Sequence, residues 1–191
     1  MINAVILAAG ESKRMGKTKA LLRFGQTSFL EQIISVVKSS DVDRVSVVLG
    51  ADAERIKKLV DLSGIEVVIN KDYRKGQLSS LIAVLESVPP DAEAILVFLV
   101  DNPFVNRTVI NRIVSKFRQT RSPIIIPVFE KKRGHPTLFA ASLFEELLNA
   151  PADEGARYVV KCNAEKVEEV EVDDGKVLAG INTPEDYKTY F

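Results

Sequence analysis

Short runs of β-branched and aliphatic residues alternate along this chain with longer segments whose apolar residues recur at helical spacing. The runs predict strands at residues 4–8, 44–49, 66–69, 95–100 and 123–127, and their residues are almost continuously apolar. Runs of this kind are typical of strands that are buried on both faces of a parallel sheet. Strands that alternate with helices favour right-handed βαβ units. We therefore predict an α/β fold with a doubly wound, mostly parallel sheet flanked by helices.

Apolar residues three and four positions apart predict the intervening helices at residues 29–37, 56–60, 78–85 and 109–117. The part of the chain after residue 128 is less regular. It predicts helices at 142–149 and 155–162, an edge strand at 167–172, a hairpin turn at 173–176 and a terminal helix capped by Thr183. The sequence contains no internal repeat, low-complexity tract or linker, so we expect one domain over residues 1–191.

Composition excludes several classes of function. The chain has 26 basic and 26 acidic residues, so its net charge is zero and no global field would attract nucleic acid or an acidic membrane. Its longest apolar run, residues 95–100, is far shorter than the ~20 residues of a spanning helix. Residues 1–9 have no basic start, so we expect a cytoplasmic protein. The single cysteine, Cys162, and the single histidine exclude an internal disulfide and a Cys-rich or multi-His metal site, and we expect Cys162 to be buried.

A long polar loop, from Gly10 to Gly25, follows the first predicted strand. Lys13, Arg14 and Lys19 lie in it, and backbone N–H groups near glycine together with cations bind phosphate. The loop also lies at the carboxyl end of a strand, where open α/β sheets bind their ligands. Its glycine spacing matches neither the phosphate-binding loop of NTPases nor the dinucleotide-binding fingerprint. A solvated basic loop is the alternative interpretation.

Two further positions invite a functional interpretation. Asp101 ends the most hydrophobic predicted strand, and it lies too far from the helix that begins near Asn106 to cap it. We therefore expect the carboxylate to have a functional role at the carboxyl rim of the sheet. Ser79 and Ser80 open a helix after Gly76, where they either cap the helix or contact a nucleotide.

Residues 7–16 read Leu-Ala-Ala-Gly-Glu-Ser-Lys-Arg-Met-Gly, which resembles the first signature of the MobA-like nucleotidyltransferases. That family activates the molybdopterin cofactor with CTP or GTP. Other segments are similar to its further motifs in the same order, and together they span nearly the whole chain: 75–81, 99–103, 133–139, 153–157 and 181–187. The Arg-Gly-His-Pro sequence at 133–136 narrows the resemblance to the cytidylyltransferase branch. The resemblance implies a Rossmann-like three-layer sandwich of the nucleotide-diphospho-sugar transferase type.

The resemblance also implies roles for individual residues. A terminal phosphate of the pterin would attack the α-phosphorus of an NTP and release pyrophosphate. Arg14, Lys19 and Asp101 would be catalytic, with Lys19 at the α-phosphate and Lys13 with Arg14 at the β- and γ-phosphates. The implied nucleotide-binding residues are Leu7, Ala8, Ala9, Gly10, Ser12, Lys13, Arg14, Lys19, Gly76, Ser79 and Ser80.

The implied metal ligands are Asp101 and Asn182, and the implied acceptor-binding residues are Arg133, His135 and Arg157. Each acceptor residue has a structural alternative. Arg133 could lie in a solvated loop, His135 could order its loop, and Arg157 could pair with Asp153 one helical turn away. An acceptor phosphate is already ionised, so His135 is not expected to act as a general base.

The chain departs from the family pattern at three positions, one of which is Ala152, where glycine is usual. Gly180 stands where Asp or Asn is frequent, which bears on the second metal contact, and Asn102 replaces the usual Met, which bears on packing.

The expected function is Mg²⁺-dependent transfer of CMP to molybdopterin. CTP is favoured over GTP because Ala8-Ala9-Gly10 contains a methyl group where GTP-using relatives often have a second glycine. The expected partners are the NTP, a molybdopterin-type acceptor and a molybdenum hydroxylase that would receive the product. Two alternatives stay open: a nucleotidyltransferase for a sugar phosphate or another phosphorylated acceptor, and a non-catalytic carrier or chaperone of the molybdenum cofactor.

Overall fold

The computed structural model describes residues 1–191 and contains an eight-stranded, mostly parallel sheet, as predicted. The strand order is β10-β7-β9-β6-β1-β4-β5, with β8 paired to β7. β1, β4, β5 and β6 run parallel to one another, β10 runs parallel to β7, and β9 and β8 are antiparallel to their neighbours. The strands of the sheet are β1 (Ile2–Ala8), β4 (Arg44–Leu49), β5 (Glu66–Ile69), β6 (Ala94–Leu99), β7 (Ile124–Phe129), β8 (Lys132–Arg133), β9 (Thr137–Ala140) and β10 (Val167–Glu171).

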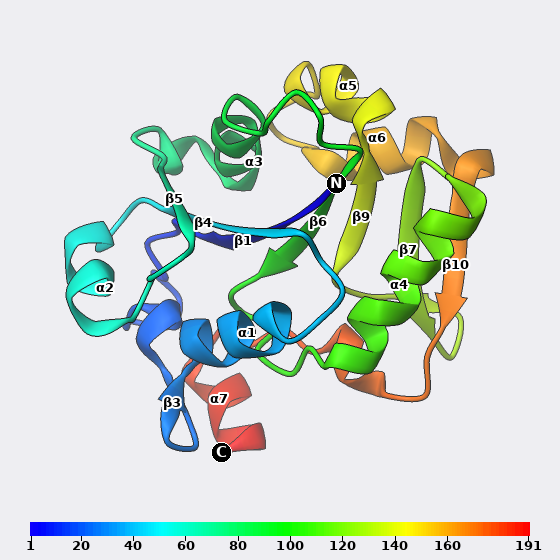
Figure 1. Ribbon diagram of the computed structural model, residues 1–191. Coiled ribbons are helices and arrows are strands. Elements are labelled where there is room, and N and C mark those ends of the chain that lie inside the picture. Colours follow the sequence, from blue (N-terminus) through cyan, green and yellow to red (C-terminus); the bar gives the residue numbers. More distant parts are fainter.

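Helices cover both faces of this sheet, as Figure 1 shows. One face carries α1 (Phe29–Lys38), α2 (Ala53–Leu59) and α4 (Arg107–Thr120), and the other carries α3 (Gln77–Leu85), α5 (Phe144–Leu148) and α6 (Ala156–Cys162). Alternate residues of β1 supply the two cores: Ile2, Ala4 and Ile6 pack with the first group of helices, whereas Val5 and Leu7 pack with the second. The continuous apolar runs of the sequence therefore reflect burial on both faces.

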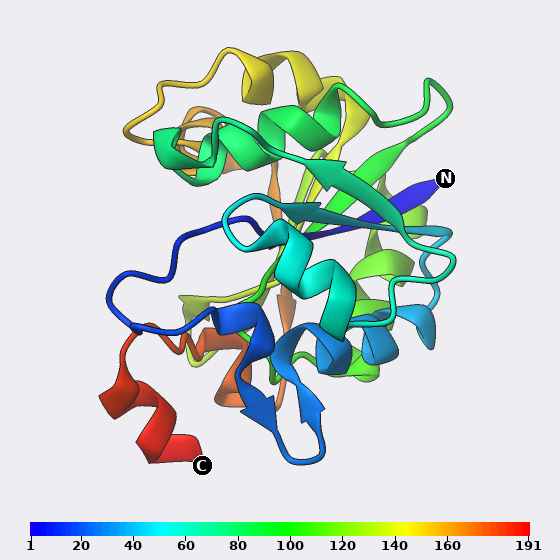
Figure 2. The same cartoon turned by 90° about the vertical axis from the view of Figure 1, so that its left-hand side faces the viewer.

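The end of the chain packs beside the hairpin of β2 (Arg23–Phe24) and β3 (Thr27–Ser28). Helix α7 (Pro184–Tyr190) begins with the predicted Thr183 cap, which forms a capping box with Asp186. An aromatic cluster joins the two segments, with Phe24 and Phe191 ring centroids 5.4 Å apart. Figure 2 shows α7 (red) next to the hairpin (blue). This packing brings the segment before α7 back to the loop that follows β1.

The structure corrects the prediction in three places. β9 was not expected, and it inserts antiparallel between β6 and β7; it contains no Val or Ile, the residues that mark every run predicted as a strand. Residues 173–176 form no hairpin, because the chain enters the short 3₁₀ turn η5 (Gly175–Leu178) and then crosses the carboxyl edge of the sheet. Cys162 is exposed rather than buried.

Four other short 3₁₀ turns connect the elements: η1 (Lys19–Leu21), η2 (Tyr73–Lys75), η3 (Ala141–Leu143) and η4 (Ala164–Lys166). None of the helices combines the length and the apolar character needed to cross a membrane.

Candidate active site

Four side chains from distant parts of the sequence meet at the carboxyl edge of the sheet. The Lys19 ammonium lies 3.3 Å from the Asp101 carboxylate and donates a hydrogen bond of 2.8 Å to the amide oxygen of Asn182. The Arg14 guanidinium donates to the same amide oxygen at 3.1 Å. The Lys19 side chain is only 14% exposed and that of Asp101 23%, so this ion pair is shielded from bulk water. Two predicted phosphate ligands and both predicted metal ligands therefore form one cluster.

The loop after β1 folds back on itself and so turns Lys19 inward. The Ser12 carbonyl accepts hydrogen bonds from the Met15 and Gly16 amides, and its hydroxyl accepts one of 3.0 Å from the Lys19 amide. The Met15 side chain is buried against Leu22 and anchors the turn to the protein core. By contrast, Lys13 is 79% exposed and pairs with Glu11.

Asn182 reaches the cluster because the preceding segment is bonded to the end of β6. The Ile181 amide donates a 2.8 Å hydrogen bond to the Asp101 carbonyl. The Asp186 carboxylate accepts hydrogen bonds from the Asn182 and Thr183 amides, and these bonds hold the pKa of Asp186 below its usual value. Asn182 is therefore held at its backbone by the start of α7 while its side chain faces the two cations.

A second loop, between β5 and α3, faces the first. The Arg74 guanidinium lies 3.7 Å from Glu11, and the hydrogen bond from Lys13 is the main reason that the pKa of Glu11 is lowered. Glu11 thus bridges a cation of each loop. Behind them, the Thr18 hydroxyl donates to Asp52 at the start of α2.

Ser79 and Ser80 do not cap α3, which corrects one of the two predicted roles. The helix begins at Gln77 after Gly76, and no side chain accepts a hydrogen bond from its first turn. The Asn70 amide instead donates to both hydroxyls, at 2.8 and 3.0 Å, and the Ser79 hydroxyl is bonded to main-chain carbonyls. The serines therefore tie α3 to the end of β5.

A cavity of about 220 Å³ lies between the two loops. Asp101 lines it, together with seven of the predicted nucleotide-binding residues: Leu7, Ala9, Gly10, Ser12, Lys19, Gly76 and Ser80. Ala8, Lys13, Arg14 and Ser79 do not. We refer to this space as the nucleotide cavity.

A second cavity, of about 620 Å³, adjoins the first and shares with it the wall residues Leu7, Gly76, Gln77 and Leu99. Arg133, His135 and Arg157, the predicted acceptor residues, all line it, and we refer to it as the acceptor cavity. Its other walls include apolar side chains from the β-strands and from α3 and α6, such as Ile126, Phe139 and Val160. Such a mixture of apolar surface and a few cations suits a ring system that carries an anionic group.

The cations of the acceptor cavity differ in their pairing. Arg133 binds Glu169 at 2.7 Å, and Lys161 pairs with Glu154. Arg157 makes no ion pair, so the structural alternative in which it pairs with Asp153 is wrong. Among these three cations only Arg157 has its full charge available to a ligand.

His135 lines the acceptor cavity, where the charges of Asp101 and Arg157 both act on its ring. Burial lowers its pKa, the Asp101 charge opposes that shift, and the Arg157 charge adds to it. The ring is therefore neutral at pH 7. Its Nδ1 atom is buried without a partner, and its main-chain amide donates to the Val177 carbonyl at 2.9 Å.

The oxygen ligands at the cluster suit a hard divalent cation that a nucleotide carries. The structure contains no group of three or more His, Cys, Asp or Glu side chains able to hold a metal alone. Asp101 and the Asn182 amide oxygen are both within hydrogen-bonding reach of Lys19, and Gly180 adds no side chain. One carboxylate and one amide oxygen, completed by phosphate and water, is a set that Mg²⁺ accepts.

Sequence reasoning missed several residues that shape the cavities. Tyr73 and Gln77 line the nucleotide cavity, and Asn70 holds the serines behind it. Gly50 follows β4, and a Cβ there would lie 2.7 Å from the Ala9 carbonyl and from the Tyr73 Cβ atom. A glycine directly after a predicted parallel strand was the available signal for Gly50. Asn70 and Gln77 offered no local signal.

A third hollow, similar in volume to the acceptor cavity, lies on the other side of the molecule, between α4 and β10. It is lined by polar side chains of both signs, such as Arg112, Lys116 and Glu171, and by one hydrophobic residue. It contains no glycine-containing, phosphate-binding turn and includes neither Lys19 nor Asp101, so it is no candidate for the active site.

The model of the MobA-like NTP transferase domain family matches residues 4–170 of this chain. Among curated relatives, the chain is 28% identical to the nicotine blue oxidoreductase of Paenarthrobacter nicotinovorans, over 96% of this chain and 93% of that protein. It is 25% identical to the molybdenum cofactor cytidylyltransferase of Escherichia coli K12, over 98% of this chain and 94% of that enzyme.

Solved structures give the same picture. The crystal structure of Rv0371c from Mycobacterium tuberculosis H37Rv superposes with a TM-score of 0.89 and 30% identity, over 98% of this chain and 95% of that one. A complex of the same protein with manganese has a TM-score of 0.84 and 27% identity, over 98% and 96% of the two chains. A nucleotidyl transferase from Methanothermobacter thermautotrophicus, 23% identical, shares the fold with a TM-score of 0.84 over 99% of this chain and 95% of that one.

Proposed function

We infer the function of this chain from its family: it belongs to the MobA-like NTP transferases and is a nucleotidyltransferase. We propose that it transfers CMP from CTP to a molybdopterin-type acceptor and releases pyrophosphate. The molybdenum cofactor cytidylyltransferase of Escherichia coli, which aligns along nearly the whole chain, supports this choice of substrates. The product would then pass to a molybdenum hydroxylase.

The observation that carries the proposal is the meeting of two cavities of different character beside Lys19 and Asp101. The smaller is bordered by a glycine-containing loop and cations, which suits a nucleotide. The larger combines apolar walls with the unpaired Arg157, which suits a pterin that carries a phosphate. Because the cavities share a wall, the two substrates can bring their phosphates together at that junction.

The proposed reaction is an in-line displacement. An oxygen of the acceptor phosphate forms a bond to the α-phosphorus of CTP, and the bond from that phosphorus to the oxygen that bridges to the β-phosphate breaks. Lys19 would neutralise charge that builds up on the α-phosphate, and Arg14 and Lys13 would hold the departing pyrophosphate. Arg157 would orient the acceptor phosphate. No general base is needed, which agrees with a buried, neutral His135.

We propose that the reaction uses Mg²⁺, held by Asp101 and Asn182 together with the substrate phosphates. When bound, the ion would neutralise phosphate charge. The manganese complex of Rv0371c supports a divalent cation in this family. Lys19 is already within 3.3 Å of Asp101, so we expect the metal to enter with the nucleotide, whose phosphates can take over the Lys19 charge.

The proposed preference for CTP rests on the wall of the nucleotide cavity at Ala9. Ala9 lines the nucleotide cavity, and its methyl group lies 2.9 Å from the place that a Cβ atom on Gly50 would take, so the two residues are close neighbours. A methyl group at this wall leaves less space for a purine than a glycine would.

The test is an assay of pyrophosphate release with CTP, GTP, ATP and UTP, each with Mg²⁺, Mn²⁺ or EDTA, and with or without molybdopterin. We expect release only with CTP, metal and molybdopterin together. Arg157→Ala should abolish most of it, whereas Lys161→Ala, in the same cavity but already paired with Glu154, should change it little. Thermal unfolding gives an independent readout, because saturation at 100 Kd adds ~2.7 kcal/mol and raises Tm by roughly 5–11 °C.

Three outcomes would overturn the proposed substrates. Release with a hexose 1-phosphate in place of molybdopterin would indicate a sugar nucleotidyltransferase. Binding of molybdopterin without any pyrophosphate release would indicate a cofactor carrier. Reduction of a dye such as nicotine blue by NADH or NADPH would indicate an activity like the one named for the Paenarthrobacter relative.

A further inference from the structure

Asn102 is an unusual residue for its position. It follows Asp101 directly, it is only 5% exposed, and its amide oxygen has no hydrogen-bond partner. Burying a polar group without a partner costs about 1–3 kcal/mol, so an apolar side chain would suit the site better if packing were all that mattered. What Asn102 contributes is its amide nitrogen, which donates a 3.2 Å hydrogen bond to the Val177 carbonyl.

The Val177 carbonyl links the end of β6 to the loop that contains His135. It accepts from Asn102 at the end of β6 and also from the main-chain amide of His135, at 2.9 Å. A Cβ atom on Gly134 would lie 2.6 Å from the same oxygen. The carbonyl is therefore enclosed between the end of β6 and the loop that borders the acceptor cavity.

Segment 177–182 leads from this junction to the catalytic cluster. At its far end the Ile181 amide donates to the Asp101 carbonyl at 2.8 Å, and Asn182 then meets Lys19 and Arg14. Between the two attachments lies the exposed Gly180. The end of β6 thus holds both ends of the segment, through the side chain of Asn102 and through the carbonyl of Asp101.

We propose that Asn102 is a positioning residue for the transfer reaction. By holding the Val177 carbonyl it fixes segment 177–182, and the fixed segment places the Asn182 amide oxygen against Lys19 and Arg14. This inference rests on the proposed function, because it assumes that these two cations act on the nucleotide phosphates. This role accounts for a buried amide at a position where packing alone does not require one.

Amide hydrogen exchange tests the structural half of the inference without any substrate. Asn102→Leu keeps a side chain of similar size but cannot donate to Val177. We expect exchange of the Ile181 amide to become at least roughly tenfold faster, because the segment loses one of its two bonds to the end of β6 and keeps, at Val177, only the bond from the His135 amide. Unchanged exchange at residues 177–182 would overturn the inference.

A double-mutant cycle with Asn182→Ala tests the functional half. If Asn102 acts through Asn182, each single variant lowers kcat about tenfold with a smaller change in the KM for CTP, and the double variant loses about tenfold as well, not the hundredfold of independent effects. Additive losses would overturn the inference. If Asn102→Leu does not fold, Asn102→Ala takes its place in the same cycle.

Asn3 supplies a matched control. It is a fully buried asparagine in β1, with its amide bonded to the Ser46 hydroxyl at 3.0 Å, and it lies near the opposite end of the strand from the site. Asn3→Leu removes a buried amide in the same way, and we expect it to leave exchange at 177–182 unchanged and to combine additively with Asn182→Ala. If instead Asn182→Ala retains wild-type rates while Asn102→Leu still frees the segment, the role proposed for Asn182 fails and the anchoring role of Asn102 stands.

Discussion

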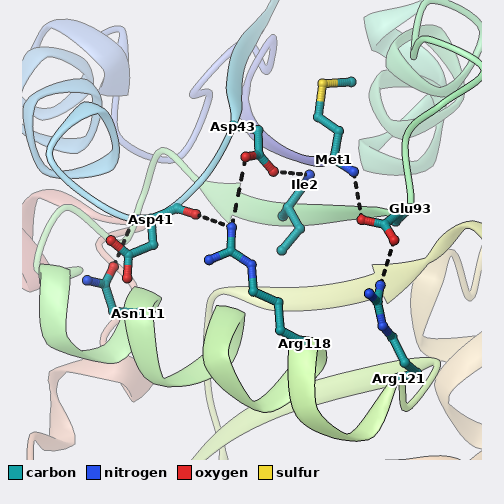
Figure 3. Close-up of polar contacts among 8 residues, drawn as sticks. All are labelled: Met1, Ile2, Asp41, Asp43, Glu93, Asn111, Arg118 and Arg121. Carbon is teal, nitrogen blue, oxygen red and sulfur yellow. Dashed lines mark hydrogen bonds and ion pairs between the residues drawn. The ribbon is translucent and has the colours of Figure 1, made fainter.

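The two edges of the sheet use charge in opposite ways. At the amino edge, the residues directly before β1, β4 and β6 are Met1, Asp43 and Glu93, and Figure 3 shows how they are linked. Glu93 binds the Met1 ammonium at 2.7 Å and Arg121 at 2.6 Å. Asp43 accepts from the Ile2 amide at 2.6 Å.

Arg118 completes the amino edge. It lies 3.9 Å from the Asp43 carboxylate and donates to the Asp41 carbonyl at 3.1 Å, while Asn111 accepts from the Asp41 amide (Figure 3). These contacts fasten α4 to the starts of the strands, and each cation there has a carboxylate partner.

At the carboxyl edge, by contrast, not every cation has a carboxylate partner. Arg14 and Arg157 have no carboxylate partner, and Lys19 shares its only one, Asp101, with the position proposed for a metal. Charges that satisfy one another contribute to holding elements together, whereas cations left without carboxylates can bind the phosphates of a substrate. The same residue types therefore serve structure at one edge and binding at the other.

The largest effect should come from replacing a carboxylate by an amide at the carboxyl edge, compared with the same replacement at the amino edge. Asp101→Asn keeps the shape of the side chain but removes its charge, and we expect kcat to fall by about a thousandfold with an unchanged fold. The matched variant Asp43→Asn should retain full activity. Steady-state kinetics and circular dichroism of both variants provide the check, and near-wild-type turnover of Asp101→Asn would place the active site elsewhere.

Removing the central cation should have the next largest effect. Lys19→Ala should lower kcat about a hundredfold and change the KM for CTP much less, because its charge is expected to act mainly as negative charge builds up on the α-phosphate. A large rise in KM with unchanged kcat would reduce Lys19 to a ground-state binding residue.

Gly50 tests how tightly the carboxyl edge is packed. The Cβ atom of Gly50→Ala would meet the Ala9 carbonyl and Tyr73 at 2.7 Å, so we expect a loss of about 1–3 kcal/mol in the free energy of unfolding. Gly10→Ala is the control, since a Cβ atom there has nothing within 4 Å and should leave stability unchanged. Urea denaturation of the two variants measures the difference, and equal stability would show that the wall can yield.

At the amino edge, Arg118→Ala should cost less than about 1 kcal/mol of stability, because both partners of this pair are partly exposed and screened. Its turnover should equal that of the wild type. A strong loss of activity in Arg118→Ala would mean that the amino edge is coupled to the site and that the contrast between the edges is wrong.

The smallest effect is a pH dependence of stability that separates the edges. Burial lowers the pKa of His135 from its ordinary 6.5, so as pH falls the unfolded chain takes up this proton before the folded chain does. The free energy of unfolding is therefore unaffected by His135 above pH 6.5 and decreases as pH falls below that value. The hydrogen bond from the Met1 ammonium, and then that from Arg121, lower the pKa of Glu93 from 4.5, so its effect is lost only as pH falls below 4.5.

Urea midpoints of the wild type and of His135→Gln between pH 8 and pH 5 measure the first of these windows. The fall in stability below pH 6.5 should be smaller in His135→Gln. An identical pH profile in both proteins would show that His135 takes up its proton equally in the folded and unfolded states.

Local sequence patterns were sufficient to predict most of the framework. Strands β1, β4, β5, β6 and β7, the four helices between 29 and 117 and the Thr183 cap lie within a few residues of their predicted places. Burial on both faces of a sheet and helical amphipathicity both produce patterns in consecutive residues. The ends of parallel strands meet at one edge. The Gly10 loop and Asp101 each follow a predicted strand, and both lie at that edge.

Other features depend on residues far apart in the sequence, and only the tertiary structure decided them. No local pattern shows that β9 inserts antiparallel between β6 and β7, that Asn70 rather than the solvent binds Ser79 and Ser80, or that Arg157 stays unpaired while Arg133 finds Glu169. The sequence alone determined which segments form the sheet and which residue types lie at its edges. The tertiary structure determined which charges are neutralised and which are left to a ligand, because an ion pair depends on the distance between two side chains in space and not on their separation along the chain.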